Sequence, residues 1–294
     1  ISNIIDLIMR IRQIRYDNTI LITDGSAEEL LQTPADIDKS LSREILGIIE
    51  NATEWSKGYD LELKDIAVES INEHSQGYVI GNVGLYNTEK LTFSIDRQEY
   101  LKMFWKDSAQ RIIYMSGGGV ISNNRLIGWL SPNELRGHLL VSNKIKHGIV
   151  QTVNLSDIGI DIAVEILNSK TEITFPDVSS ENITGEIGVK VVCQVVEIKG
   201  VAPEHSMTFI EKLGKEVGNA IASEIYLVLD RAQNQLQTDF LGIHKIFRAK
   251  HRKEWLLLKG NWCEYFCNIP FTCKVDVKIQ NEGLLSRTFK SEGP

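Results

Sequence analysis

Residues 158–166 read IGIDIAVEI, a stretch in which every second side chain is Ile or Val and the intervening ones are small or acidic. A period of two predicts a β-strand with one buried face and one wetted face. Residues 271–279, FTCKVDVKI, repeat the pattern, and the side chains predicted to face inward are Phe271, Cys273, Val275, Val277 and Ile279. Both stretches need a sheet with one covered face, so they decide the fold class.

Further segments extend this sheet. We predict strands at residues 148–155, 172–175 and 187–198. A hairpin is expected over residues 112–129, because Asn123 and Asn124 tolerate the positive φ that a tight turn requires. The C-terminal part of the chain is therefore predicted to contain a large antiparallel or mixed sheet.

Helices that can cover the sheet follow in the sequence. Residues 206–237 place apolar side chains at steps of three and four, which is typical of a long helix with one buried face. A shorter helix is expected at about 252–262. We therefore predict an α+β domain over residues 109–294, a β-sheet backed by long helices.

Smaller mixed α/β units are expected before this domain, since 294 residues exceed one typical core of roughly 100–150 residues. Ser26 is placed to cap a helix after a short strand, and Pro34 ends that unit. The predicted elements are a helix at 3–15, a strand at 19–23, mainly helical structure at 41–75, a strand at 78–85 and a helix-like or irregular stretch to Asp107. The predicted domains are 1–33, the remainder of an N-terminal α/β domain, 34–108, a mainly helical middle domain, and 109–294.

The net charge of -7 disfavours binding to nucleic acid. The densest cationic stretch, Lys245–Lys253, is more simply explained as a solvated face. No apolar run is long enough to span a bilayer. The chain starts at Ile1 within an amphipathic pattern, so we expect that a signal or anchor segment has been removed or is not shown.

The cysteines leave three alternatives open. Cys263, Cys267 and Cys273 lie close together, and Cys193 falls on the apolar phase of a predicted strand. Zinc would require a fourth ligand, for which the spacing offers only His244 or His251. A disulfide between two of these cysteines is a further alternative, and free thiols packed as small hydrophobes are favoured. We expect neither a metal nor another cofactor.

The sequence offers no catalytic motif. The glycines at 117–119 precede a hairpin, whereas a phosphate-binding loop opens a helix. The six histidines are scattered, and no nucleophile stands in a known local signature. Trp129, Trp255 and Trp262 are by default core residues, although tryptophan is also enriched at interface hot spots.

Two blocks resemble the Ger(x)C family of spore germination proteins. The first runs from Asp239-Phe240-Leu241-Gly242-Ile243-His244-Lys245 through Trp255 and Trp262 to the strand at 274–279. The second comprises Gly118-Gly119-Val120, 124–130 and Glu134-Leu135-Arg136-Gly137. A less specific match is DGSAEELL at 24–31. The chain departs from the family in lacking a proline shortly before Trp255 and in lacking the lipobox cysteine and the residues that normally follow it.

The resemblance implies a non-enzymatic lipoprotein, the C subunit of a nutrient germinant receptor. Such a subunit lies on the outer face of the spore inner membrane through a lipid anchor such as palmitate, and works with a membrane-spanning A subunit and a transporter-like B subunit. It also suggests that Trp129, Arg136, Trp255 and Trp262 contact these partners. The rival function, a small-molecule module that binds the germinant, requires an apolar pocket with converging polar groups. An enzyme is the weakest alternative and would require perturbed titratable groups in such a pocket.

Overall fold

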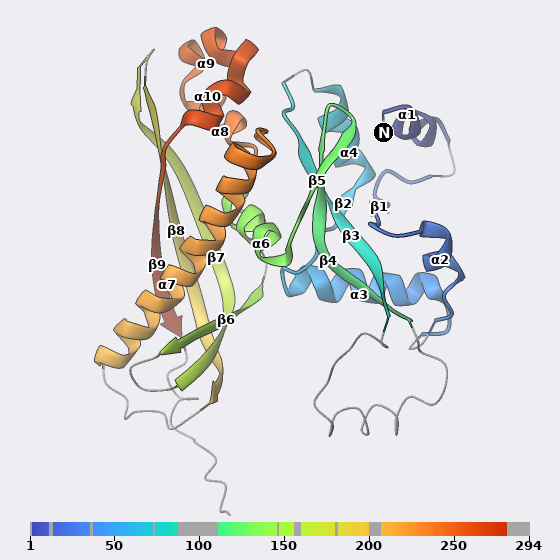
Figure 1. The fold of residues 1–294 in the computed structure, drawn as a ribbon, viewed down its shortest axis with the longest axis horizontal. Helices are drawn as coiled ribbons and strands as arrows, with labels where there is room; N and C mark the ends of the chain where they lie inside the picture. Colours follow the sequence, from blue (N-terminus) through green and yellow to red (C-terminus); the bar gives the residue numbers. More distant parts are fainter. Residues whose placement is uncertain are drawn as a thin grey trace, which may run out of the picture.

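The computed structural model describes residues 2–11, 14–35, 38–72, 74–87, 111–145, 147–155, 160–179, 182–199 and 207–280. Two lobes lie side by side in Figure 1, with helix α6 between them. The stretch up to Asp107 that was predicted to be helix-like or irregular lies largely in 88–110, outside the described residues.

The N-terminal lobe combines short helices with two small antiparallel sheets, ordered β1-β2 and β3-β4-β5. At the hairpin between β4 and β5, Asn123 and Asn124 have φ of 48° and 62°, which confirms the predicted turn. The elements are α1 (Ser2–Arg10), β1 (Thr19–Ile20), α2 (Ala27–Gln32), α3 (Leu41–Glu54), β2 (Leu61–Glu62), α4 (Leu63–Ile71), β3 (Tyr78–Asn87), β4 (Arg111–Ser122) and β5 (Arg125–Leu130).

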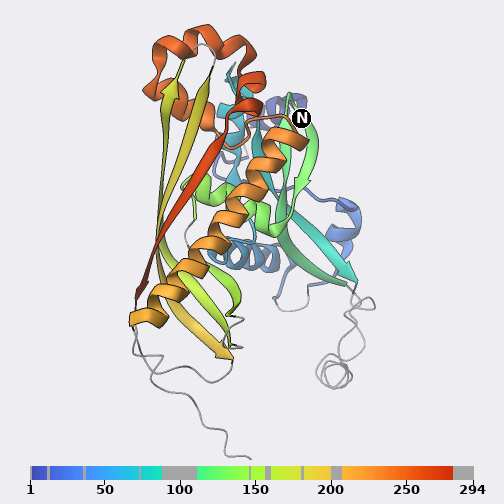
Figure 2. The ribbon, with the colours of Figure 1, turned by 60° about the vertical axis from the view of Figure 1, so that its left-hand side comes forward.

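The C-terminal lobe is built on the sheet β6-β7-β8-β9, in which β8 and β9 are parallel and the other pairs antiparallel. Helix α7 runs diagonally across one face of this sheet (Figure 2). The elements are α6 (Pro132–Val141), β6 (Gly148–Leu155), β7 (Ile160–Val178), β8 (Ile183–Lys199), α7 (Met207–Asp230), the π-helical turn Arg231–Gln235, α8 (Ile243–Lys250), α9 (Arg252–Leu258), the 3-10 turn Lys259–Asn261, α10 (Trp262–Asn268) and β9 (Phe271–Gln280).

The predicted α+β architecture is confirmed. The sheet alternates as expected, with Ile162, Val164 and Ile166 buried, and β9 follows the predicted phase along its whole length. The two segments at 158–166 and 172–175 belong to one long strand, β7. Helices α6 and α8 were not predicted. The apolar residues of α6 are not gathered in one stripe, and α8, which has such a stripe, is only eight residues long.

Strand pairing crosses both predicted domain boundaries. Thr19 and Ile20 pair with Glu62 and Leu61, and β3 pairs with β4 on the far side of residue 108. One hydrophobic cluster also includes buried residues of both lobes. The divisions at 33/34 and 108/109 therefore need correction, because a strand edge satisfies its backbone groups with whichever neighbour completes the sheet. We propose a single division after Leu130, where α6 begins.

Helix α6 is the junction between the lobes, and every residue from Leu135 to Val141 is buried. Ser131 and Glu134 form a capping box that fixes its start. Gly137 lets the helix approach α7, since a Cβ there would lie 2.3 Å from the Glu224 carbonyl oxygen. Helices α6 and α7 are therefore packed backbone to backbone.

A buried ion pair fixes this contact. One edge of the Arg136 guanidinium faces the Glu224 carboxylate, with Nε donating to Oε2 at 2.7 Å and Nη2 to Oε1. The third nitrogen, Nη1, donates to the Ile149 carbonyl of β6 at 2.7 Å. The two side chains are only 10% and 9% exposed, so α6, α7 and β6 are joined by one dehydrated cluster.

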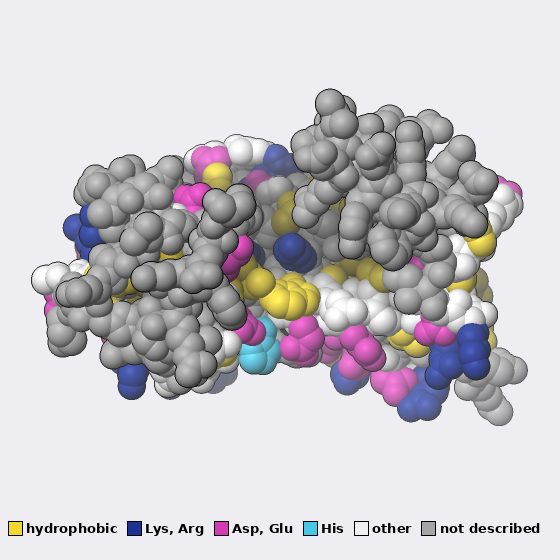
Figure 3. Space-filling view, turned by 90° about the horizontal axis from the view of Figure 1, so that it is seen from below, with side chains coloured by type: hydrophobic (Ala, Val, Ile, Leu, Met, Phe, Trp, Pro, Cys, Tyr) yellow, Lys and Arg dark blue, Asp and Glu magenta, His cyan; other side chains and the backbone are white. Residues whose placement is uncertain are grey.

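No described helix is long and apolar enough to cross a membrane. On the face seen from below, acidic and basic side chains lie next to one another (Figure 3). The described side chains visible on that face therefore carry charges of both signs.

Replacing Arg136 with Met should lower the free energy of unfolding by about 3–5 kcal/mol, because the Glu224 carboxylate remains buried without its partner. Urea denaturation followed by circular dichroism measures the change. The matched control is Arg10→Met, whose ion pair with Asp6 is 76% and 62% exposed and should contribute little to stability, because solvent screens it. Equal losses in the two variants would contradict the structural role of Arg136.

Candidate functional site

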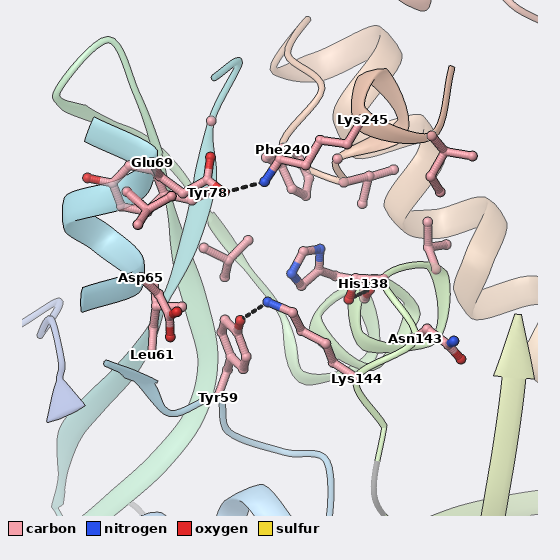
Figure 4. A pocket seen from close by; sticks show the side chains of 18 of the residues that line it. Tyr59, Leu61, Asp65, Glu69, Tyr78, His138, Asn143, Lys144, Phe240 and Lys245 are labelled. Atoms are coloured by element: carbon pink, nitrogen blue, oxygen red, sulfur yellow. Dashed lines mark hydrogen bonds and ion pairs between the residues drawn. The ribbon is translucent and has the colours of Figure 1, made fainter. Parts of the chain in front are cut away.

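A cleft of about 790 Å³ opens between the two lobes. One wall comes from residues 59–79 of the N-terminal lobe, and the other from the end of α6 and the turn before α8. Figure 4 shows side chains of both walls pointing into the space between them. The volume is within the range of roughly 300–1,000 Å³ typical of small-molecule sites.

Lys144 and Tyr59 meet across the cleft. The Lys144 ammonium donates to the Tyr59 hydroxyl and lies 4.9 Å from the centre of the tyrosine ring. Burial lowers the pKa of Lys144, and the nearby Asp65 carboxylate opposes this shift. Burial also raises the pKa of Tyr59, an effect to which Asp65 adds, so the phenol stays protonated.

His138 lies deep in the same cleft, with its ring between Tyr59 and Phe240. The residue is 5% exposed, and burial, followed by the charge of Lys144, lowers its pKa from 6.5 to about 3. The ring is therefore neutral at pH 7. Its buried Nδ1 has no hydrogen-bond partner among the described residues.

Carboxylates occupy the wall opposite His138. Asp60, Asp65 and Glu69 all line the cleft. Glu69 pairs with Lys245 of α8 and accepts a hydrogen bond from the Ser75 hydroxyl at 2.8 Å. The Lys245 to Glu69 pair is a second polar contact from one lobe to the other.

Beside the cleft, helices α8, α9 and α10 form a cap over the end of the C-terminal sheet, organised by the buried Asp239. Asp239 Oδ1 accepts from the backbone of Ile243 at 3.0 Å, and Oδ2 accepts from the backbone of His244 at 2.6 Å. Oδ2 also lies 3.0 Å from His244 Nδ1 and accepts from Trp262 Nε1 at 2.9 Å. One carboxylate thus joins the start of α8 to the start of α10.

Three of the four predicted partner-contact residues are buried. Trp255 and Trp262 are 3% and 1% exposed and pack with ring centres 5.3 Å apart, and Arg136 forms the internal ion pair. Direct contact with a partner at these three positions stays a prediction, and the little surface that they expose disfavours it. Trp129 is partly exposed, and its carbonyl accepts from Arg231 at 2.8 Å.

The four cysteines are free thiols. Burial raises the pKa of Cys193 to about 12 and that of Cys273 to about 11, and the Cys263 thiol donates to Gln76 Oε1 at 2.7 Å. His244 bonds to Asp239, and His251 stacks on Phe247. Within the described ranges no group of three potential ligands is arranged to hold a metal.

The cleft residues were not singled out by the sequence. His138 was one of six scattered histidines, while Tyr59 and Lys144 are 85 positions apart and carry no local motif. Only the closure of one lobe against the other brings them together. The polar residues Arg136 and His138 among the apolar residues of 135–141 were the one available signal.

Two family descriptions match the chain in order. "Spore germination protein N-terminal domain" matches residues 1–83, and "Spore germination B3/GerAC like, C-terminal" matches residues 116–283. The chain belongs to the GerAC-like family of spore germination proteins. The Ger(x)C resemblance is thereby confirmed.

Individual relatives agree with this assignment. The GerAC-like chain is 26% identical to spore germination protein B3 of Bacillus subtilis (strain 168) over 205 residues, which cover 66% of this chain and 52% of the relative. It therefore spans about half the length of that relative. A crystal structure of the GerBC protein has the same fold, with a TM-score of 0.70 and 20% identity over 95% of this chain and 75% of GerBC.

Replacing Asp239 with Asn should destabilise the cap by about 2–4 kcal/mol, because an amide cannot accept all four hydrogen bonds and places donors against donors. Near-ultraviolet circular dichroism of Trp255 and Trp262 during urea unfolding measures this. Asp230→Asn is the control, since that exposed carboxylate bonds only to Asn234 and Gln235 of its own helical segment. If the cap were as stable in Asp239→Asn as in Asp230→Asn, the role of Asp239 would be contradicted.

Acid should destabilise the protein through His138. The unfolded imidazole gains its proton near pH 6.5 and the folded one near pH 3, so within this window falling pH favours the unfolded state by up to ~1.4 kcal/mol per pH unit. Above pH 6.5 this contribution is constant. The free energy of unfolding, measured by urea denaturation, should differ between wild type and His138→Asn by an amount that changes with that slope from pH 6.5 to 4.5. An imidazole NMR signal of His138 that titrates near pH 6.5 in the folded protein would contradict it.

Proposed function

We propose that this chain is a non-enzymatic subunit of a nutrient germinant receptor, needed for the germinant response through assembly with the A and B subunits. The match to spore germination families along both lobes carries the proposal. In the cell it would lie at the outer face of the spore inner membrane, held by an N-terminal lipid anchor outside the present sequence.

The cap is the partner surface that we favour. Leu256 and Leu257 of α9 are 59% and 85% exposed, and Tyr265 of α10 is also exposed. Residues 243–268 carry six Lys or Arg side chains and two Glu, although the whole chain is acidic. An exposed apolar pair within a basic rim is the arrangement expected of a docking site. Trp255 and Trp262 would act indirectly, by fixing α9 and α10 from beneath.

The chemistry of the cleft favours binding over catalysis. A general base works best with a pKa near the operating pH, whereas that of His138 is about 3. Burial raises the pKa of Tyr59, which makes its phenolate less accessible as a nucleophile. The shifts in the pKa values of His138 and Tyr59 therefore make both groups less suited to acid–base catalysis at neutral pH.

The second candidate, a small-molecule binding module, is favoured by one observation. The cleft combines an apolar lining with converging polar groups from both lobes. Binding there and assembly through the cap would use separate surfaces.

Replacing Leu257 with Asp should reduce retention of the A and B subunits at least tenfold when the receptor is purified from detergent-solubilised spore membranes, because a carboxylate would enter the apolar contact. Folding should be unaffected, since the side chain is 85% exposed. Leu31→Asp, at a 67% exposed position on α2, is the matched control. Loss of retention in Leu31→Asp alone would indicate that the interface lies on the N-terminal lobe. Retention in both variants would show that the cap is not the partner surface.

A further inference from the structure

The cleft has an unmatched cation on one side. Lys144 is an exposed residue whose hydrogen bond to Tyr59 is part-buried, and among the described residues its ammonium has no carboxylate within 4.0 Å. Its close partner is the neutral phenol of Tyr59. A partly dehydrated ammonium is stabilised by an opposite charge, so this position suits an anionic group.

The facing wall has the opposite character. In the described part of the chain Asp60 and Asp65 form no ion pair, whereas Glu69 is already neutralised by Lys245. Figure 4 shows Asp65 across the cleft from Lys144, on the far side of the Tyr59 ring. A cationic group is therefore favoured at this wall.

Between the two walls lie groups that suit the body of a small molecule. His138 stays neutral and adds no charge. Its Nδ1 has no partner among the described residues and is buried, so the ring would have to turn toward the cleft to bond a ligand. Phe240, Leu61 and Val79 supply apolar surface. An unpaired polar atom inside a protein costs free energy, which a ligand hydrogen bond would offset.

We propose that the cleft binds a small zwitterion with an apolar substituent, its carboxylate at Lys144 and its ammonium at Asp65. The molecule would bridge the two lobes, because Lys144 follows α6 and Asp65 lies on α4. This inference rests on the second candidate function, small-molecule binding in the cleft, and gives the class of ligand. It does not depend on the assembly role, since the cap is not involved.

The test uses the whole chain and three probes that share the leucine side chain. L-leucine carries both charges, L-leucinamide lacks the carboxylate and N-acetyl-L-leucine lacks the ammonium. Titration calorimetry, or NMR shifts of His138 and Tyr59, should show leucine binding about tenfold or more tightly than either analogue, as expected when each charge contributes one ionic contact.

Two variants assign the contacts. In Lys144→Met, leucine should bind no better than leucinamide, because the carboxylate has lost its partner. In Asp65→Asn, leucine should bind no better than N-acetyl-leucine. Lys215→Met, which replaces an exposed lysine on α7, should leave all three affinities unchanged.

Several outcomes would overturn the proposal. These are no binding of leucine at 10 mM (about the weakest binding such titrations detect), equal binding of leucine and leucinamide by wild type, or an unaltered leucine affinity in Lys144→Met. Loss of leucine binding in Lys215→Met would likewise place the site elsewhere. Subunit retention is a separate measurement. A negative result in the leucine titrations therefore does not affect the proposed assembly role, and a negative result in the retention assay does not affect the proposed ligand site.

Discussion

The structure depends on the burial of α6 and on the ion pair that this burial demands. In the buried part of α6, water cannot hydrate the Arg136 guanidinium. The charge is therefore stable there only if a carboxylate inside the protein pairs with it. Glu224 provides it from α7, and the Ile149 carbonyl completes the set from β6. Gly137 permits the close approach that makes these contacts short. The cluster fixes α6 on the C-terminal lobe, and α6 in turn packs against β4 and β5 of the N-terminal lobe.

A second buried carboxylate organises the other end of the C-terminal lobe. Asp239 gathers donors from α8 and α10, and the indole rings of Trp255 and Trp262 fill the space beneath α9. This packing leaves Leu256 and Leu257 on the outside. The chain therefore uses its large aromatic residues to hold a rigid cap, and smaller apolar residues form the exposed surface.

The cleft between the lobes is a consequence of the same arrangement. Its two cross-lobe contacts, Lys144 with Tyr59 and Lys245 with Glu69, join segments that are distant in sequence. His138 is carried into the cleft by the fully buried α6, which explains both its neutral state and its unpaired nitrogen. The cap and the cleft share α8, so a change in the relative position of the lobes would alter the structure of both.

The sequence by itself determined the elements whose pattern is local: the alternating strands β7 and β9, the long helix α7, the Asn123-Asn124 hairpin, the family and the α+β class. Period and turn chemistry act within a few residues, so they can be read along the chain. Only the tertiary structure decided that β3 joins β4, that Arg136, Trp255 and Trp262 are internal, and that Tyr59, His138 and Lys144 share a cleft. These depend on which surfaces are dehydrated when distant segments pack, and no local pattern records that choice.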